Sequence, residues 1–136
     1  MKSFYELEEY ALVKDVPIMQ KEGIEYLIDE LNKRNAESVL EIGSAIGYSS
    51  LMMVTHVKGL HVDTIERDEE RIAEAKVNIK NVGVEDKINI YEGDAVEILP
   101  TLNDEYDVVF IDAAKGKYPF FLNQALRMIK PGGVIF

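Results

Sequence analysis

The chain has 136 residues, of which 47% are hydrophobic and 29% charged, and a net charge of −10 at pH 7. This composition is typical of one soluble globular domain with a substantial core. The chain has no cysteine, which excludes a disulfide scaffold and thiolate metal sites. No run of about 18 apolar residues could cross a membrane, and no apolar signal-peptide core is present, so we expect a cytoplasmic protein. The acidic charge argues against tight nonspecific binding to nucleic acid, but not against an RNA acceptor engaged at one nucleotide.

Hydrophobic periodicity predicts two helices at the N-terminus. Residues 3–14 carry a weak apolar stripe at helical spacing, and Pro17 ends it because proline disfavours helix in the residue before it. Between Glu22 and Asn32 the apolar residues fall at i, i+3, i+4 and i+7, which predicts a second helix. Strands and helices then alternate: predicted strands cover residues 38–42, 60–66, 87–91, 107–112 and 134–136, and predicted helices cover 48–57, 68–82, 95–100 and 119–129.

This βαβαβαβαβ order predicts an α/β fold with a doubly wound, Rossmann-like parallel sheet and right-handed crossovers. We expect one domain over residues 1–136, with N-terminal helices in residues 1–35 and a βα core in residues 36–136. The continuous apolar run at 107–112 is typical of a central strand that is covered on both faces.

The last predicted helix begins at Pro119, because proline suits the first helical position. Lys130–Gly133 is expected to end this helix, and its expected core stripe consists of Leu122, Ala125, Leu126 and Ile129. The sequence stops within the fifth strand, so we expect a fragment whose sheet is incomplete after that strand. An exposed fifth strand also favours self-association, as a homodimer.

Two glycines organise the segment Ser38–Ser50. It is predicted to form a buried strand, a tight turn with Gly43 and Gly47, and the first turn of a helix. Such a unit directs helix N–H groups at a bound group, and glycine allows close approach to the backbone. The spacing is Gly-x-x-x-Gly, whereas the dinucleotide fingerprint is Gly-x-Gly-x-x-Gly. A turn without any ligand explains this pair equally well.

Glu66 ends the second predicted strand, about twenty residues after Gly43, where nucleotide-binding α/β units place a ribose-binding carboxylate. A carboxylate there can accept hydrogen bonds from both vicinal hydroxyls of a ribose. The alternative is an ordinary solvated glutamate at a strand end. Together with the glycine turn, Glu66 favours an adenosine-type ligand.

Four acids lie at the predicted carboxyl ends of successive strands: Glu41, Glu66, Asp94 and Asp112. Ligands of open parallel sheets bind at that edge, so we expect these acids to line a polar crevice. Asp94 could instead cap a short helix. Asp112 could hold a hard divalent cation through oxygen, or it could pair with Lys115 or cap the following turn.

Four segments of the chain carry a resemblance to a known family: Val39–Ser49, Thr64–Glu66, Glu92–Ala95 and Phe110–Gly116. They resemble the successive motifs of class I S-adenosylmethionine-dependent O-methyltransferases, and within them the metal-dependent catechol and caffeoyl-CoA branch. Val16–Met19 before Glu22–Ile24, together with Gly43–Ser49, is most similar to bacterial enzymes that methylate 5-hydroxyuridine in tRNA.

The resemblance implies a role for each matching residue. Gly43, Ala45 and Ser49 would touch the methionine part of the cofactor, Glu66 would hold the ribose, Asp94 and Ala95 would flank the adenine, and Met19 would close over the cofactor. Glu41, Gly47, Arg67 and Asp112 complete the predicted cofactor-binding set.

The resemblance also implies a catalytic pair. Asp112 would be the first ligand of Mg²⁺ or another divalent cation, and Lys115 matches the catalytic lysine of the family. Two further metal ligands of the family, an Asp-Asn pair, lie just beyond the fifth strand, past the last residue of this sequence.

The predicted function is therefore transfer of a methyl group from S-adenosylmethionine to a hydroxyl, that of 5-hydroxyuridine in tRNA. The alternatives are a small catechol-like phenol as the acceptor, or a noncatalytic fragment that binds the cofactor. A nicotinamide oxidoreductase is disfavoured, because the middle glycine of the dinucleotide fingerprint is missing.

Overall fold

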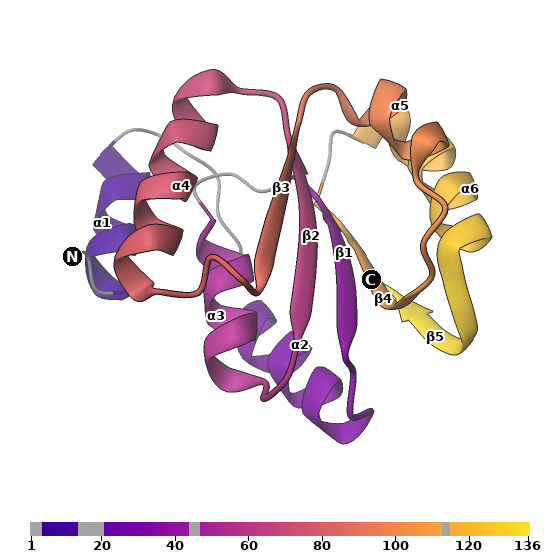
Figure 1. Cartoon of the computed structure of the whole chain (residues 1–136), viewed down its shortest axis with the longest axis horizontal. Coiled ribbons are helices and arrows are strands. Elements are labelled where there is room, and N and C mark those ends of the chain that lie inside the picture. The colour runs from indigo at the N-terminus through magenta and orange to yellow at the C-terminus, as the bar shows by residue number, and fades with distance from the viewer. Residues whose placement is uncertain (1–3, 14–20, 44–46, 113–114) are drawn as a thin grey trace.

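The computed structural model describes residues 4–13, 21–43, 47–112 and 115–136. It confirms the predicted alternation of strands and helices (Figure 1). The elements are α1 (Phe4–Val13), α2 (Lys21–Lys33), β1 (Ser38–Ile42), α3 (Tyr48–His56), β2 (His61–Glu66), α4 (Glu69–Val82), β3 (Ile88–Glu92), α5 (Ala95–Ile98), the 3₁₀ turn η1 (Leu99–Thr101), β4 (Tyr106–Ile111), the 3₁₀ turn η2 (Lys115–Lys117), α6 (Tyr118–Met128) and β5 (Ile129–Ile135). No helix among these elements is both long and apolar enough to cross a membrane.

The five strands form one parallel sheet in the order β3-β2-β1-β4-β5. Strand β1 lies at its centre and pairs with both β2 and β4. The chain therefore winds outward from β1 in both directions, and the sheet has its topological switch point there. In open α/β sheets, ligands bind beyond the carboxyl ends of the strands at this point. The predicted doubly wound fold is confirmed.

Two apolar cores cover the two faces of the sheet, as side-chain alternation along a strand requires. On one face Val39 and Val108 pack against α1, α2, α3 and α4. On the other face Leu40 and Val109 pack against α5, η1 and α6. Figure 1 shows these two helical layers on either side of the strands.

The C-terminal segment differs from the prediction. Lys130–Gly133 does not end the helix in a loop, because β5 already begins at Ile129 and runs through these residues. The strand accommodates them with an irregular register opposite β4, between Tyr106 and Val108. A side chain at Gly133 would come within 2.7 Å of the carbonyl oxygen of Asp107, so glycine permits this close approach.

Helix α6 also buries a different face from the predicted one. Its buried residues are Phe121, Ala125 and Met128, whereas Leu126 is 58% exposed. The prediction failed because it included Ile129, which belongs to β5, and so placed the stripe about one residue out of phase. Phe121 belongs to the same buried cluster as Leu40 and Val109 of the sheet.

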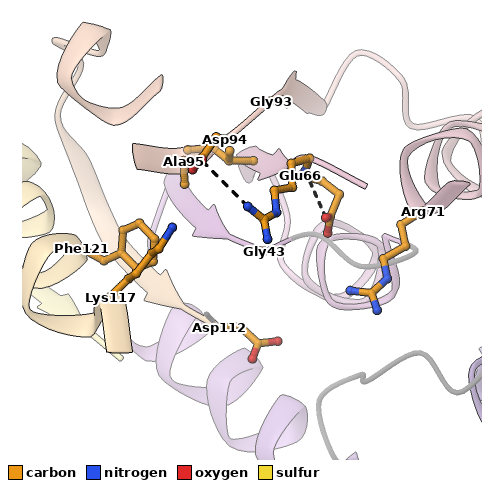
Figure 2. Close-up of a pocket in the computed structure, with 11 residues that line it drawn as sticks. Gly43, Glu66, Arg71, Gly93, Asp94, Ala95, Asp112, Lys117 and Phe121 are labelled. Carbon is orange, nitrogen blue, oxygen red and sulfur yellow. Dashed lines mark hydrogen bonds and ion pairs between the residues drawn. The ribbon is translucent and has the colours of Figure 1, made fainter. Parts of the chain in front are cut away.

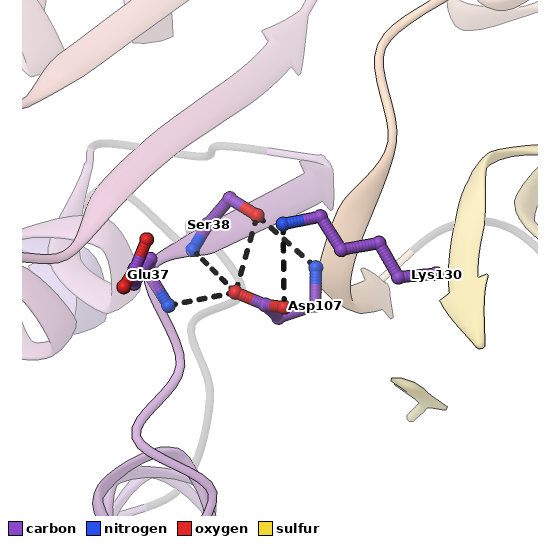
Figure 3. Close-up of polar contacts among 4 residues, drawn as sticks. All are labelled: Glu37, Ser38, Asp107 and Lys130. Carbon is purple, nitrogen blue, oxygen red and sulfur yellow. Dashed lines mark hydrogen bonds and ion pairs between the residues drawn. The ribbon is translucent and has the colours of Figure 1, made fainter. Parts of the chain in front are cut away.

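The amino-terminal edge of the sheet is held by Asp107 at the start of β4 (Figure 3). One carboxylate oxygen accepts hydrogen bonds from the backbone N–H groups of Glu37, at 2.8 Å, and Ser38, at 3.2 Å. The other lies 3.5 Å from the ammonium of Lys130. These hydrogen bonds and the positive charge lower the pKa of Asp107 against the opposing effect of partial burial. Asp107 thus joins the starts of β1 and β4 to β5.

Candidate cofactor-binding site at the carboxyl ends of the strands

A pocket of about 230 Å³ opens at the edge of the sheet where β1, β2, β3 and β4 end (Figure 2). Its described lining combines backbone, apolar and charged groups: Gly43, Ile65, Glu66, Arg67, Arg71, Gly93, Asp94, Ala95, Asp112, Lys117 and Phe121. This is the edge where the sequence predicts a polar crevice. Three of the four predicted acids, Glu66, Asp94 and Asp112, line it.

Gly43 brings the ends of β1 and β4 together. Its N–H donates to the carbonyl oxygen of Ile65 at 3.0 Å, and Asp112 N–H donates to the carbonyl oxygen of Ile42 at 2.9 Å. The φ angle of Gly43 is 102°, and a side chain there would collide with the backbone oxygen of Asp112. Only glycine therefore fits this position, which leaves the floor of the pocket lined by backbone.

Glu66 is the last residue of β2, and its carboxylate is fixed by the start of the next segment. One carboxylate oxygen accepts hydrogen bonds from the backbone N–H groups of Arg67, at 3.1 Å, and Asp68, at 3.2 Å. The side chain is 9% exposed and lines the pocket. A largely desolvated carboxylate held in this way is a directed acceptor for hydroxyl groups of a ligand.

Asp94 has the capping role that was the alternative in the sequence, and it also lines the pocket. Its carboxylate accepts a hydrogen bond from the N–H of Val96 at 2.9 Å, which caps the short helix α5. The other oxygen lies 3.9 Å from the guanidinium of Arg67. Capping thus fixes Asp94 beside Ala95 at one end of the pocket.

Asp112 follows the last residue of β4 and points into the pocket region (Figure 2). Its side chain remains accessible to solvent, but partial loss of hydration and repulsion by the Glu66 carboxylate raise its pKa. Within the described residues no ion pair involves Asp112. Lys115 begins the turn η2 a few residues later, and its catalytic role stays a prediction.

Glu41, the fourth predicted acid, does not line the pocket. It is fully buried, and its carboxyl group accepts hydrogen bonds from the hydroxyls of Ser49, Ser50, at 2.7 Å, and Thr64, at 2.8 Å. Burial raises its pKa, while these three hydrogen bonds act in the opposite direction. The residue points to this side because strand alternation places it on the same face as Val39, beneath α3.

Of the remaining predicted cofactor residues, the structure describes Gly47 and Ser49 but not Met19 and Ala45. Gly47 has a φ of 83°, and a side chain there would lie 3.3 Å from the Cβ of Ala75, so this glycine lets α3 begin against α4. Ser49 is 8% exposed, and its hydroxyl is bound to Glu41. Met19 and Ala45 lie outside the described residues.

A divalent cation needs several oxygen ligands. Among the described residues, no group of three or more histidine, cysteine, aspartate or glutamate side chains could hold a metal ion. The described part of the chain therefore does not supply a metal site around Asp112.

Arg71 is a pocket residue that the sequence reasoning missed. It lies in the first turn of α4, whose cap Asp68 follows Glu66 by two residues. That short spacing is the available signal, because a helix that starts next to a strand end presents its first turn to the same edge of the sheet. Lys117 is a second pocket residue outside the predicted set, and it enters the pocket from η2.

A family model described as O-methyltransferase matches residues 3–136. A catechol O-methyltransferase of Niastella koreensis is 36% identical over 105 residues, covering 74% of this chain and 48% of that protein. A caffeoyl-CoA O-methyltransferase of Populus kitakamiensis is 32% identical over 134 residues, 94% of this chain and 57% of that protein. The chain thus spans about half the length of these curated relatives.

Solved structures give the same result. An O-methyltransferase from Bacillus cereus in complex with SAH superposes with a TM-score of 0.88 at 26% identity, covering 99% of this chain and 66% of that one. Sequence and fold therefore agree along the described chain, and this protein belongs to the O-methyltransferase family.

Proposed function

We propose that this chain binds S-adenosylmethionine in the pocket at the carboxyl ends of the strands and that its protein transfers the methyl group to a hydroxyl. The observation that carries the proposal is the position of Glu66. Its desolvated carboxylate lines the pocket at the end of β2, held by two backbone N–H groups. The B. cereus relative, which has the same fold, was solved with SAH.

The pocket has a suitable group for each part of the cofactor. Glu66 accepts the ribose hydroxyls, and Asp94 with Ala95 flanks the adenine. Backbone at Gly43 faces the methionine part, where no side chain stands in the way. The carboxylates of Glu66 and Asp112 also favour a ligand that carries a positive sulfonium.

Methyl transfer is an in-line displacement at the sulfonium carbon by an oxygen nucleophile. The protein has to align the two reactants and to accept the proton of the hydroxyl. Asp112 lies beyond the end of β4 and would bind and orient the acceptor hydroxyl. Lys115, in the same loop, is the proposed proton acceptor.

Metal assistance is a separate part of the proposal. Asp112 is the proposed ligand of Mg²⁺, which would lower the pKa of the bound hydroxyl. Because the described residues contain no three-ligand group, we assign no step of the reaction to a metal. Loss of transfer after chelation, and its return with added Mg²⁺, is the expected result if the whole protein uses one.

The acceptor is proposed to be a hydroxyl on an aromatic ring, whose acidity makes deprotonation easier than for an alcohol. Our first choice is 5-hydroxyuridine in tRNA. The second is a catechol, favoured by the 36% identity to the catechol O-methyltransferase of N. koreensis. Methyl transfer from radiolabelled cofactor to each acceptor, measured side by side with the whole protein, separates them.

Calorimetric titration with S-adenosylhomocysteine tests the cofactor site. We expect Glu66→Ala to weaken binding about 100-fold, because two hydrogen bonds to a charged group are lost. Glu92→Ala is the matched control: Glu92 pairs with Glu66 in register at the end of β3, but its carboxylate binds Lys76 at 2.6 Å. This variant should bind within about twofold of the parent, as expected for a surface substitution.

A circular dichroism melt of each protein accompanies the titration. A parent chain that melts cooperatively but does not bind S-adenosylhomocysteine would contradict the proposal. Equal affinity of the parent and Glu66→Ala would show that this carboxylate does not hold the ribose.

A further inference from the structure

Two of the three cations that line the pocket, Arg71 and Lys117, have no charge partner within the described residues. The third cation, Arg67, has one, because its guanidinium lies 3.9 Å from Asp94. No ion pair of the described residues includes Arg71 or Lys117, although both side chains line the same cavity. Each is therefore available to an anion brought by a ligand.

The two cations enter the pocket from different elements. Arg71 comes from the first turn of α4, and Lys117 from the end of η2, directly before α6. Figure 2 shows them on opposite sides of the pocket, with Asp112 between them. The proposed point of methyl transfer is thus flanked by a positive charge on each side.

The proposed cofactor does not account for these charges. Adenosine is neutral, the sulfonium is itself a cation, and the single carboxylate of the methionine part is assigned to the Gly43 end. A free phenol is neutral as well. A polynucleotide, in contrast, carries a phosphate on each side of every internal nucleotide, and arginine and lysine are the usual phosphate ligands.

We propose that Arg71 and Lys117 bind the two phosphates that flank the methylated nucleotide of a polynucleotide acceptor. This assignment rests on the proposed function, which places the acceptor hydroxyl at Asp112. Because Glu66 and Asp112 are negative and the chain has a net charge of −10, phosphate binding depends on these two side chains and not on a broad basic surface.

The test is fluorescence anisotropy with a short fluorescein-labelled oligouridylate, titrated at several salt concentrations with and without saturating S-adenosylhomocysteine. Each phosphate contact to a single strand contributes about 0.7 to the slope of log K against log salt. We expect Arg71→Gln and Lys117→Gln each to reduce the slope by about 0.7, and the double variant to reduce it by about 1.4.

Lys58→Gln is the matched control, because it removes one charge at the opposite edge of the sheet, in the turn before β2. It should leave the slope unchanged, and Lys117→Arg should keep the parent slope. Equal slopes in the parent and both pocket variants would overturn the proposal, as would an equal loss in Lys58→Gln. The same holds if a cooperatively folded parent does not bind RNA at low salt.

Two further results separate this inference from the proposed function. A parent that binds S-adenosylhomocysteine but not RNA overturns the phosphate sites and leaves the cofactor site standing. Coenzyme A, which carries its phosphates on one side of its thiol, serves as a competitor of the labelled oligouridylate. Competition by coenzyme A that is lost in both pocket variants would overturn the polynucleotide acceptor in favour of a phosphorylated small acceptor.

Discussion

Two aspartates at opposite ends of β4 have opposite environments. Asp107, at the start of the strand, accepts two backbone hydrogen bonds and pairs with Lys130, and its pKa is lowered (Figure 3). Asp112, just past the end, has no ion-pair partner among the described residues, and its pKa is raised. At the amino edge of the sheet the charge is used to join strands. At the carboxyl edge it remains available to a ligand.

A pair of glycine substitutions should have the largest effect. Gly43→Ala at the carboxyl edge combines a strained φ of 102° with a collision against the Asp112 backbone, and we expect it to lower the free energy of unfolding by about 3 kcal/mol or more. Gly59→Ala at the amino edge has a φ of 77° and no atom within 4 Å of the new side chain. This substitution should lower the free energy of unfolding by only about 1 kcal/mol. Urea denaturation followed by circular dichroism measures both, and equal losses would contradict the close approach of β1 and β4.

Removal of the Asp107 and Asp112 carboxylates should affect stability differently at the two edges of the sheet. Asp107→Ala leaves the N–H groups of Glu37 and Ser38 without this acceptor, and we expect a loss of about 2 kcal/mol. Asp112→Ala should change the free energy of unfolding by less than about 0.5 kcal/mol, while it abolishes methyl transfer by the whole protein. If Asp112→Ala destabilised the fold as much as Asp107→Ala, Asp112 would be a structural residue.

The pH dependence of stability should have opposite signs at the two positions. The folded pKa of Asp107 is lowered, so its stabilisation is present above the unfolded value of about 4 and is lost as the pH falls through the folded pKa. Asp107→Asn should therefore be less stable than the parent at pH 7, and the difference should shrink in acid.

The folded pKa of Asp112 is raised, so its ionised form is unfavourable in the fold above that pKa. Asp112→Asn should be slightly more stable than the parent at pH 7, and this gain should vanish below about pH 4. Urea midpoints measured across this range, with chelator present, test both signs. A parallel pH response of the two variants would contradict the comparison.

Lys130→Met should have a smaller effect on stability than Asp107→Ala. The ammonium of Lys130 lies 3.5 Å from Asp107, and both side chains are partly exposed, so we expect a loss of about 0.5 kcal/mol that disappears at high salt. Comparison with Asp107→Ala then shows how much of the stabilisation by Asp107 comes from its backbone hydrogen bonds. If Lys130→Met lowered the free energy of unfolding as much as Asp107→Ala does, the stabilisation would come from the ion pair and not from the backbone hydrogen bonds.

Local patterns in the sequence were enough for most of the fold. The apolar periodicity of α2, the cap Asp68 with Gly83 at the other end of α4, and the apolar run of β4 each act within a few residues. The sequence therefore predicted which elements form and that they build a parallel sheet. It also placed Glu66, Asp94 and Asp112 at one edge, because parallel strands end at the same edge.

The direction of each side chain at that edge was decided by the tertiary structure. Glu41 ends buried under three hydroxyls because its neighbours on the strand fix its face and α3 covers that face. The packing of α6 against the sheet decides that Phe121 is buried and Leu126 is exposed. Arg71 and Lys117, which lie 46 residues apart in the sequence, meet one pocket only through the order of the strands. Such contacts depend on packing between residues far apart in the sequence, and local periodicity carries no information about that packing.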